Sequence, residues 1–403
     1  MLVAIIGGGA SGLFAAAVIS KYASVTVFER NEKAGKKIYI TGKGRCNFTN
    51  LCLPNEFLAS VVRGSKFLIS AINSFPPEKA IDFFSEHGMK SVVERGNRVF
   101  PQSNKASDVT ATLVKTISAN GGKILYDTRV QKIIACDGGF TITANGEEFK
   151  FDKVILATGG VSYQSTGSTG DGYKFASEFG HAIIEPRPAL SPIILKEDVS
   201  SIEGLSLKNV CVKVISGKKE YSEFGEMLFT HSGVSGPCVL TLSSLINRLD
   251  GQKQLVIDLK PAITKEELDK RILRDFEANI NRDYKNSLRD LLPKSLIPYI
   301  IARSKINPDK KVNLITKEER LVLVDLLKNL TFTIDSLDKI DYAIVTSGGV
   351  DVKEVSPKTM ESKLVPNLYI IGELLDVDAF TGGFNLQIAW ATAYAAARHI
   401  GDF

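Results

Sequence analysis

The sequence predicts an α/β protein whose parallel sheet is built from both ends of the chain, with a second domain inserted between them. Three short apolar runs, at residues 2–6, 154–157 and 368–372, have the continuous hydrophobic character of strands that are buried on both faces of a sheet. Between the second and third runs, residues 265–329 are rich in charge and helical in period. The strands of one sheet are therefore far apart in the chain, and the domain that they form is discontinuous.

The first apolar run opens a βαβ unit. Residues 13–20 have the composition of a helix and residues 25–29 that of a second strand, and two parallel strands need a helical crossover of this kind. The turn between strand and helix carries the pattern Gly7-x-Gly9-x-x-Gly12. In this pattern the first glycine permits a tight turn, the second lets the backbone approach a pyrophosphate, and the third lets the helix pack on the strand.

The residues around this turn have the charge pattern of a dinucleotide site. The first amides of the helix lie at its positive end, which favours a diphosphate. Glu29 ends the second strand and is positioned to accept hydrogen bonds from a ribose hydroxyl pair, with Arg30 beside it. The sequence therefore predicts a Rossmann-like domain that binds a dinucleotide, and the mild net charge of +5 suits an anionic ligand of this kind.

FAD and NAD share this glycine pattern, and the C-terminal segment favours FAD. Gly372 and Glu373 follow the last apolar strand, where a carboxylate can bind the ribityl chain or its neighbours; a helix cap is the alternative explanation. Gly382 and Gly383 open a terminal helix that is rich in alanine. Its first amides can point at the flavin pyrimidine, where negative charge develops on reduction. We expect FAD as the cofactor.

The rest of the chain divides into further parts. From residue 124 to residue 151 the hydrophobic period changes to two, which indicates a strand leading into a small β-meander. Short strands follow the prolines near residue 190, and the helical stretch comes after them. We assign an FAD-binding domain, an inserted β-rich domain and a helical subdomain, which cover residues 1–190 with 341–403, residues 191–262 with 330–340, and residues 263–329.

A glycine-rich basic loop at residues 41–47 is the first candidate for chemistry. Lys43 and Arg45 are predicted to stabilise a phosphate or an anionic reduced flavin, with Cys46 and Asn47 facing the flavin. A solvated basic turn is the alternative. Arg45 and Cys46 are therefore both cofactor contacts and catalytic candidates.

Other candidate proton donors are few, because the chain has only four histidines. His231 lies in a polar, glycine-rich stretch of the inserted domain, where it is either a general acid or substrate contact, or a structural loop residue. For Tyr163 and Asp376, a role as proton donor and a purely structural role are equally well supported. No metal is expected, because metal-ligand spacing is absent around the other three histidines, His87, His181 and His399.

The five cysteines bear on redox chemistry and on the cellular compartment. An odd number scattered through a long chain argues against a disulfide scaffold and favours a reducing compartment. A cytoplasmic location is expected, since the first strand starts almost at the initiator Met and no apolar stretch is long enough for a membrane span. Flavin disulfide reductases carry a redox pair separated by four residues, whereas five separate Cys46 from Cys52. A redox pair is therefore not expected.

The segment Gly167-Ser168-Thr169-Gly170-Asp171-Gly172 looks like a second phosphate loop, but its glycines stand in the wrong order. We expect a loop near the flavin, with Asp171 capping the next helix. The chain thus has no second dinucleotide fingerprint. NADH or NADPH, if it is the electron donor, would bind transiently and without a dedicated domain.

Five segments carry a resemblance to a known family. They are residues 5–13, the box Gly44-Arg45-Cys46-Asn47-Phe48-Thr49-Asn50, residues 230–237, residues 346–350 and residues 372–387. Together they resemble the BaiN/YhiN-like family of bacterial FAD-binding proteins nearly from end to end, and the Arg-Cys-Asn-Phe-Thr-Asn box is the most specific of them. The resemblance implies a glutathione-reductase-like FAD domain that is interrupted by a β-barrel-like domain with a helical subdomain.

The motif and the resemblance together imply a set of residues that contact FAD. Val130 is expected to contact the adenine through its backbone. The full set is Gly7, Gly9, Ala10, Ser11, Gly12, Glu29, Arg30, Lys37, Gly44, Arg45, Cys46, Val130, Ala157, Thr158, Gly159, Gly372, Glu373, Gly383, Phe384, Asn385 and Leu386.

The resemblance implies an NAD(P)/FAD-dependent oxidoreductase and leaves three functions open. In the first, NAD(P)H reduces the flavin, whose N5 passes a hydride to a conjugated carbonyl compound or a dehydro-steroid-like small molecule. In the second, suggested by the missing NAD fingerprint, an aminoacetone-type amine oxidase releases peroxide. In the third, the chain is a non-enzymatic FAD-holding partner protein, for example in RNA modification. The isoelectric point near 8.7 permits this third function without favouring it, so nucleic acid is not an expected partner. The oligomeric state is not predicted.

Overall fold

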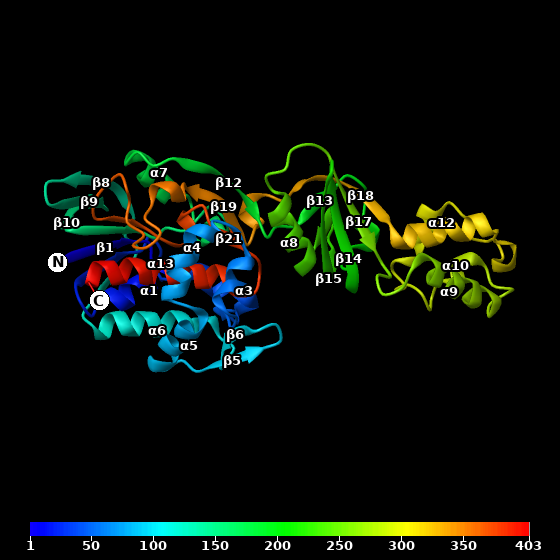
Figure 1. The fold of residues 1–403 in the computed structure, drawn as a ribbon, viewed down its shortest axis with the longest axis horizontal. Coiled ribbons are helices and arrows are strands. Elements are labelled where there is room, and N and C mark those ends of the chain that lie inside the picture. The colour runs from blue at the N-terminus through cyan, green and yellow to red at the C-terminus, as the bar shows by residue number, and fades with distance from the viewer. Residues whose placement is uncertain (403) are drawn as a thin grey trace. The chain divides into compact units, whose positions relative to one another are not determined.

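The computed structural model describes residues 1–402, which form two compact units (Figure 1). The first unit combines the two ends of the chain, residues 1–189 and 340–402. The second unit is the intervening segment, Leu190–Lys339. Within residues 1–402, none of the helices combines the length and the apolar character that a membrane crossing requires.

The first unit is built on a five-stranded parallel sheet in the order β20-β11-β1-β2-β7. Its central strands carry apolar side chains on both faces, and other elements of the unit cover both faces of the sheet. Val3, Ala4 and Ile5 accordingly have no exposed surface. The predicted Rossmann-like parallel sheet is thereby confirmed. Its strands are β1 (Leu2–Ile6), β2 (Ser24–Phe28), β7 (Lys123–Leu125), β11 (Lys153–Leu156) and β20 (Leu368–Ile370).

Two helices from opposite ends of the chain lie against each other in this unit, α1 (Ala10–Ile19) and α13 (Phe384–Gly401) (Figure 1). Both are rich in alanine along their buried sides, which permits the close approach. The other helices of the unit are α2 (Lys36–Ile40), α3 (Pro54–Ala59), α4 (Ser65–Ser74), α5 (Pro77–Glu86), α6 (Ala106–Ala119) and α7 (Asp171–Glu178).

Small antiparallel sheets complete the unit. The meander consists of β8 (Val130–Cys136), β9 (Gly139–Ala144) and β10 (Glu147–Phe151), and β12 (Ile183–Ala189) pairs with β19 (Val345–Val350) where the chain leaves and re-enters the unit. The remaining strands are β3 (Thr49–Asn50), β4 (Val61–Arg63), β5 (Ser91–Glu94), β6 (Arg98–Pro101) and β21 (Asp378–Ala379).

The second unit contains a closed antiparallel barrel in the order β13-β16-β15-β14-β17-β18, so the expected barrel-like insertion is confirmed. The chain between β17 and β18 forms helices that gather at one end of the barrel (Figure 1). The strands are β13 (Ile193–Leu195), β14 (Ser206–Ser216), β15 (Lys219–Phe229), β16 (Gly233–Ser235), β17 (Lys253–Asp258) and β18 (Leu330–Leu337). The helices are α8 (Pro237–Ile246), α9 (Lys265–Glu277), α10 (Tyr284–Ser287), α11 (Ile297–Ser304) and α12 (Lys317–Lys328).

A buried histidine in the first unit should make folding stability depend on pH. His181 is 3% exposed, with Nδ1 3.2 Å from Glu354 and Nε2 2.8 Å from Ser362. Burial lowers the pKa of the imidazole, and Glu354 only partly opposes the shift. Because the unfolded chain binds the proton more tightly, this stability is complete above the unfolded pKa of about 6.5 and is lost as pH falls through the folded pKa.

We therefore expect the melting temperature of the wild-type protein to fall between mildly alkaline and mildly acidic pH. His181→Gln removes the titrating group, so the melting temperature of the variant should fall less on acidification. At the higher pH the variant should be less stable than wild type, because it loses the imidazole contacts with Glu354 and Ser362. The difference between the two melting curves across pH isolates His181 from the other histidines. An identical acid-induced loss in both proteins would contradict this assignment.

Candidate functional site

The predicted cofactor residues gather where four neighbouring parallel strands end. Gly7 follows β1, Glu29 follows β2, residues 157–159 follow β11, and residues 372–373 lie just beyond β20. The strand order places these four ends side by side at one edge of the sheet. Ligands of open α/β sheets bind at this carboxyl edge.

The three glycines of the first turn have different structural roles. A Cβ at Gly7 would lie 2.6 Å from the Ala157 carbonyl oxygen, and one at Gly12 would lie 1.9 Å from the Gly7 carbonyl oxygen. These two glycines are therefore required by packing. A Cβ at Gly9, by contrast, meets no atom of the described residues within 4 Å. The protein itself leaves the space above Gly9 open, as a bound diphosphate requires.

The start of α1 faces this open space without a cap from the protein. Gly9 is the N-cap residue, and no side chain bonds to the first turn. The first amides of a helix have no acceptor within the helix. Ala10 and Ser11, both predicted contacts, thus offer their amides at the positive end of the helix.

Glu29 lies beside the glycine turn and is 6% exposed. One carboxylate oxygen accepts from the Gly8 amide at 2.9 Å, and the other accepts from the Asn31 amide and side chain at 2.8 and 2.7 Å. Burial raises the pKa of this carboxyl, and the amide hydrogen bonds oppose the shift. A carboxylate has about four acceptor positions, so capacity for ribose hydroxyls remains.

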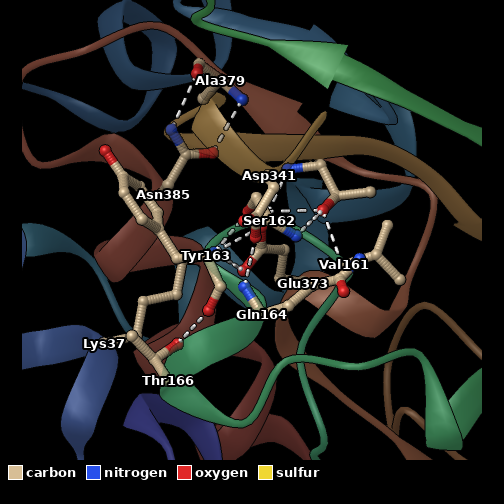
Figure 2. Close-up of polar contacts among 11 residues, drawn as sticks. Lys37, Val161, Ser162, Tyr163, Gln164, Thr166, Asp341, Glu373, Ala379 and Asn385 are labelled. Carbon is tan, nitrogen blue, oxygen red and sulfur yellow. Dashed lines mark hydrogen bonds and ion pairs between the residues drawn. The ribbon is translucent and has the colours of Figure 1, made fainter. Parts of the chain in front are cut away.

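Lys37 and Glu373, both predicted to contact FAD, bind each other (Figure 2). Lys37 Nζ donates to both Glu373 oxygens at 3.0 and 2.9 Å and to the Ser162 hydroxyl at 2.6 Å. Glu373 also accepts from the Thr346 amide at 2.8 Å. The network joins three segments that are far apart in the chain, and both charged side chains are about one-fifth exposed.

Lys37→Met is expected to destabilise the protein and to weaken FAD binding together, because it leaves the partly buried Glu373 carboxylate without its cation. Hydrogen bonds to charged groups contribute about 1.5–3 kcal/mol, and the residual exposure places the loss toward the lower end of that range. Urea unfolding of the apoprotein measures the loss. A double-mutant cycle with Glu373→Gln isolates the pair, and additive effects would contradict a direct coupling.

The basic loop places Arg45 against protein partners. Its guanidinium donates to the Glu94 carboxylate and, at 2.8 and 2.6 Å, to the Asn104 side chain, and it lies 4.2 Å from the centre of the Phe100 ring. The charge of Arg45 is therefore neutralised within the protein. Lys43, whose backbone is left-handed with φ 57°, has no ion-pair partner among residues 1–402.

Cys46 is fully buried beneath this loop, and burial raises the pKa of its thiol to about 12. Since the thiolate is the reactive form of cysteine, this environment argues against Cys46 as a catalytic candidate. Cys46 and Cys52 are both free thiols. Gly44, next to Arg45, adopts a left-handed φ of 84° that closes the turn.

The start of α13 is held close to the segment that follows the loop. A Cβ at Gly383 would lie 2.4 Å from the Thr49 carbonyl oxygen. The Asn385 side chain bonds to the amide and carbonyl of Ala379 at 3.0 and 2.7 Å (Figure 2). Because this side chain is occupied, Asn385 would contact a cofactor mainly through its backbone; Phe384 and Leu386, its neighbours at the start of α13, stay predicted contacts.

The residues near the predicted adenosine end form a second ion-pair network. Arg30 donates to Asp171 at 3.4 Å, and Arg129 donates to the same carboxylate at 3.1 Å. Asp171 does not cap α7 as expected, since Gly170 holds the N-cap position; its carboxylate binds the two arginines instead. Val130, at the start of β8, is buried beside Arg129 in the chain.

His231 lies in the second unit, in the connection before β16. Its side chain is 78% exposed and lies 3.0 Å from Glu203.

The residues of the sheet edge fit FAD. The open space at Gly9, the uncapped starts of α1 and α13 and the buried Glu29 carboxylate match a diphosphate, a flavin pyrimidine and a ribose. Thr158 adds a buried hydroxyl without a partner among the described residues. FAD bound here would supply hydride chemistry, and the protein would bind and orient it.

Several residues of the site carried little signal in the sequence. Ser162 binds both Lys37 and Glu373, and the Thr346 amide donates to Glu373. Asp341 accepts from the amides of Tyr163 and Gln164 (Figure 2). Only the stretch at residues 346–350 stood out as a motif. Serine, threonine and aspartate are common in loops, so these residues could not be selected without the fold.

Comparison with known proteins gives full-length relatives. The chain is 35% identical to the ribosomal RNA dihydrouridine synthase of Haemophilus influenzae, covering 98% of this chain and 97% of that one. It is 33% identical to the 3-dehydro-bile acid delta(4,6)-reductase of Clostridium scindens over 98% of both chains. It is 32% identical to the ribosomal RNA dihydrouridine synthase of Escherichia coli, covering 98% and 97%.

Solved structures agree on the fold. A 3-ketosteroid Δ1-dehydrogenase from Sterolibacterium denitrificans matches with a TM-score of 0.53 at 14% identity, covering 99% of both chains. A 3-ketosteroid Δ4-(5α)-dehydrogenase from Rhodococcus jostii RHA1 matches with a TM-score of 0.52 at 15% identity, covering 98% of this chain and 96% of that one. The family model described as HI0933-like protein Rossmann domain matches residues 1–399, which confirms the resemblance. The chain therefore belongs to the HI0933-like Rossmann family and is an FAD-dependent oxidoreductase.

Proposed function

We propose that this protein reduces a carbon–carbon double bond conjugated to a carbonyl group, with electrons that pass from NADH or NADPH through FAD. The observation that carries the proposal is the chemistry shared by relatives with different names. Dihydrouridine is the product formed when the ring carbon–carbon double bond of uridine, which is conjugated to a carbonyl group, is reduced. In a 3-dehydro-bile acid with Δ4,6 unsaturation, the double bonds are conjugated to the 3-oxo group. Both names describe the reduction of an electron-poor double bond, which a hydride from reduced flavin can achieve.

The start of α13 supports a reductase of this kind. Amides at the positive end of an 18-residue helix would stabilise the negative charge of a reduced flavin pyrimidine. No second dinucleotide fingerprint is present in the sequence, so the nicotinamide would visit the flavin only transiently.

Two substrates deserve a direct comparison, uridine in ribosomal RNA and a 3-oxo-4,6-diene steroid. The mild net charge of +5 gave no reason to expect RNA as a partner. The names of two relatives, at 35% and 32% identity, make ribosomal RNA the first substrate to test.

Anaerobic half-reactions test the proposal. NADH or NADPH should bleach the flavin, and either unmodified ribosomal RNA or the dienone steroid should then restore its colour without oxygen. If neither nicotinamide bleaches the flavin, NADH and NADPH are excluded as electron donors. Rapid reoxidation in air with peroxide release from aminoacetone, and no response to the two acceptors, would favour the oxidase alternative.

A further inference from the structure

A tyrosine in the loop after β11 has a strained backbone at the candidate site. Tyr163 has φ 52° and ψ 56°, a left-handed conformation that bulky residues rarely adopt. Its amide donates to the Asp341 carbonyl at 3.1 Å, and its carbonyl accepts from the Thr166 amide and hydroxyl at 2.8 and 2.7 Å. The Asp341 carboxylate also accepts from the Gln164 amide at 2.6 Å. Such strain persists only where the surroundings enforce it, and it clusters at functional sites.

The side chain of Tyr163 takes no part in these restraints. The residue is partly exposed, and its hydroxyl has no hydrogen-bond partner within residues 1–402. In Figure 2 the ring extends away from the hydrogen bonds that hold the backbone. The preceding residue, Ser162, is buried and bonds to Lys37 and Glu373 at 2.6 and 3.3 Å. The loop therefore presents a free phenol next to the charged network of the site.

Three other candidate proton donors of the first unit are poorly placed for this role. The Cys46 thiol is fully buried. The Tyr173 hydroxyl is also buried, and burial raises its pKa far above the usual range. Arg63 holds the Asp376 carboxylate through two hydrogen bonds of 3.0 Å. Tyr163, by contrast, is partly exposed, and no described residue binds its hydroxyl.

We propose that Tyr163 is the catalytic proton donor in the double-bond reduction, an inference that rests on the proposed function. A hydride, with its electron pair, passes from the reduced cofactor to the β-carbon, and the double-bond electrons shift toward the carbonyl. The resulting enolate takes a proton at its α-carbon from the Tyr163 hydroxyl. The phenolate then regains a proton from water, so two hydrogens are added in total.

Tyr163→Phe tests this role, because it keeps the ring and removes only the hydroxyl. The matched control is Tyr342→Phe, since Tyr342 is 59% exposed and follows Asp341. FAD affinity of each apoprotein and flavin reduction by the nicotinamide should stay within about twofold of wild type, because neither uses a proton donor to the substrate. Reoxidation of the dithionite-reduced enzyme by the ribosomal RNA or the dienone steroid should slow about 100-fold or more in Tyr163→Phe alone.

The pH profile provides a readout that a merely structural role would not move. The pH dependence of reoxidation should differ between wild type and Tyr163→Phe, because the variant lacks the hydroxyl that donates the proton. Reoxidation of the variant within about threefold of wild type would overturn the inference, since general acids contribute more than that. A selective loss of FAD affinity would also overturn it and make Tyr163 a cofactor contact. If wild-type flavin is reoxidised by neither substrate, the proposed function fails first.

Discussion

Gly9→Val is expected to give a stably folded protein that purifies without FAD. A Cβ at this position meets no described atom within 4 Å, and the backbone at φ −83° and ψ −165° lies in the extended region that valine adopts readily. The side chain would instead occupy the space above the first turn of α1. FAD affinity of the apoprotein should fall by more than about 100-fold, or about 2.7 kcal/mol, in a fluorescence titration.

Gly12→Ala provides the matched comparison within the same motif. Its Cβ would lie 1.9 Å from the Gly7 carbonyl oxygen, so strand and helix would have to separate. Overpacking of this kind costs about 1–3 kcal/mol or more, and the apoprotein should melt at a lower temperature. Normal yellow colour in Gly9→Val would contradict the diphosphate site, and a Gly9→Val melting temperature as low as that of Gly12→Ala would show that its side chain disturbs the fold.

Glu29→Ala should weaken FAD binding by about 10–150-fold, because hydrogen bonds to a charged carboxylate contribute about 1.5–3 kcal/mol. Part of the loss comes through the protein, since the Gly8 amide would lose its acceptor at 2.9 Å and the glycine turn would loosen. Isothermal titration of the apoprotein with FAD measures the effect.

ADP and Glu29→Gln serve as controls for this prediction. ADP carries the same ribose and diphosphate, so its affinity should fall by a similar factor. Glu29→Gln keeps one oxygen acceptor and should give an intermediate loss. An unchanged affinity of Glu29→Ala for ADP would show that Glu29 does not bind the ribose, whatever the effect on FAD binding.

The sequence was informative wherever a feature depends on neighbouring residues. The β1–glycine turn–α1 unit follows from an apolar run, a glycine spacing and a helical segment that adjoin one another. The same holds for β20 and for the start of α13, where Gly383 has a φ of 97° that favours glycine. These features could be predicted because the residue types of a short segment determine its backbone conformation and the burial of a strand.

Charge pairing was less accessible from the sequence. Arg45 looked like a free cation in a basic loop, yet Glu94 and Asn104 bind it. Asp171 looked like a helix cap, yet two arginines bind it. Cys46 was a catalytic candidate, and its complete burial became visible only with the chain folded around it. The partner of a long charged side chain is set by proximity in space, for which local patterns carry no information.

Tyr163 illustrates the same division between local pattern and folded contact. The sequence offered Tyr163 as a candidate proton donor without favouring it over a structural role, whereas its left-handed backbone, which depends on the distant Asp341, was visible only in the fold.

The amino-acid sequence alone was enough for the type of sheet, the cofactor class and the glycine turn at which we expect the diphosphate. The folded chain was needed to show that Lys37 and Glu373, 336 residues apart, bind each other, and which hydroxyls stay free at the site. The physical reason is that glycine turns and buried strands depend on the conformations of adjacent residues. Ion pairs and burial arise only when distant segments meet at the edge of one sheet.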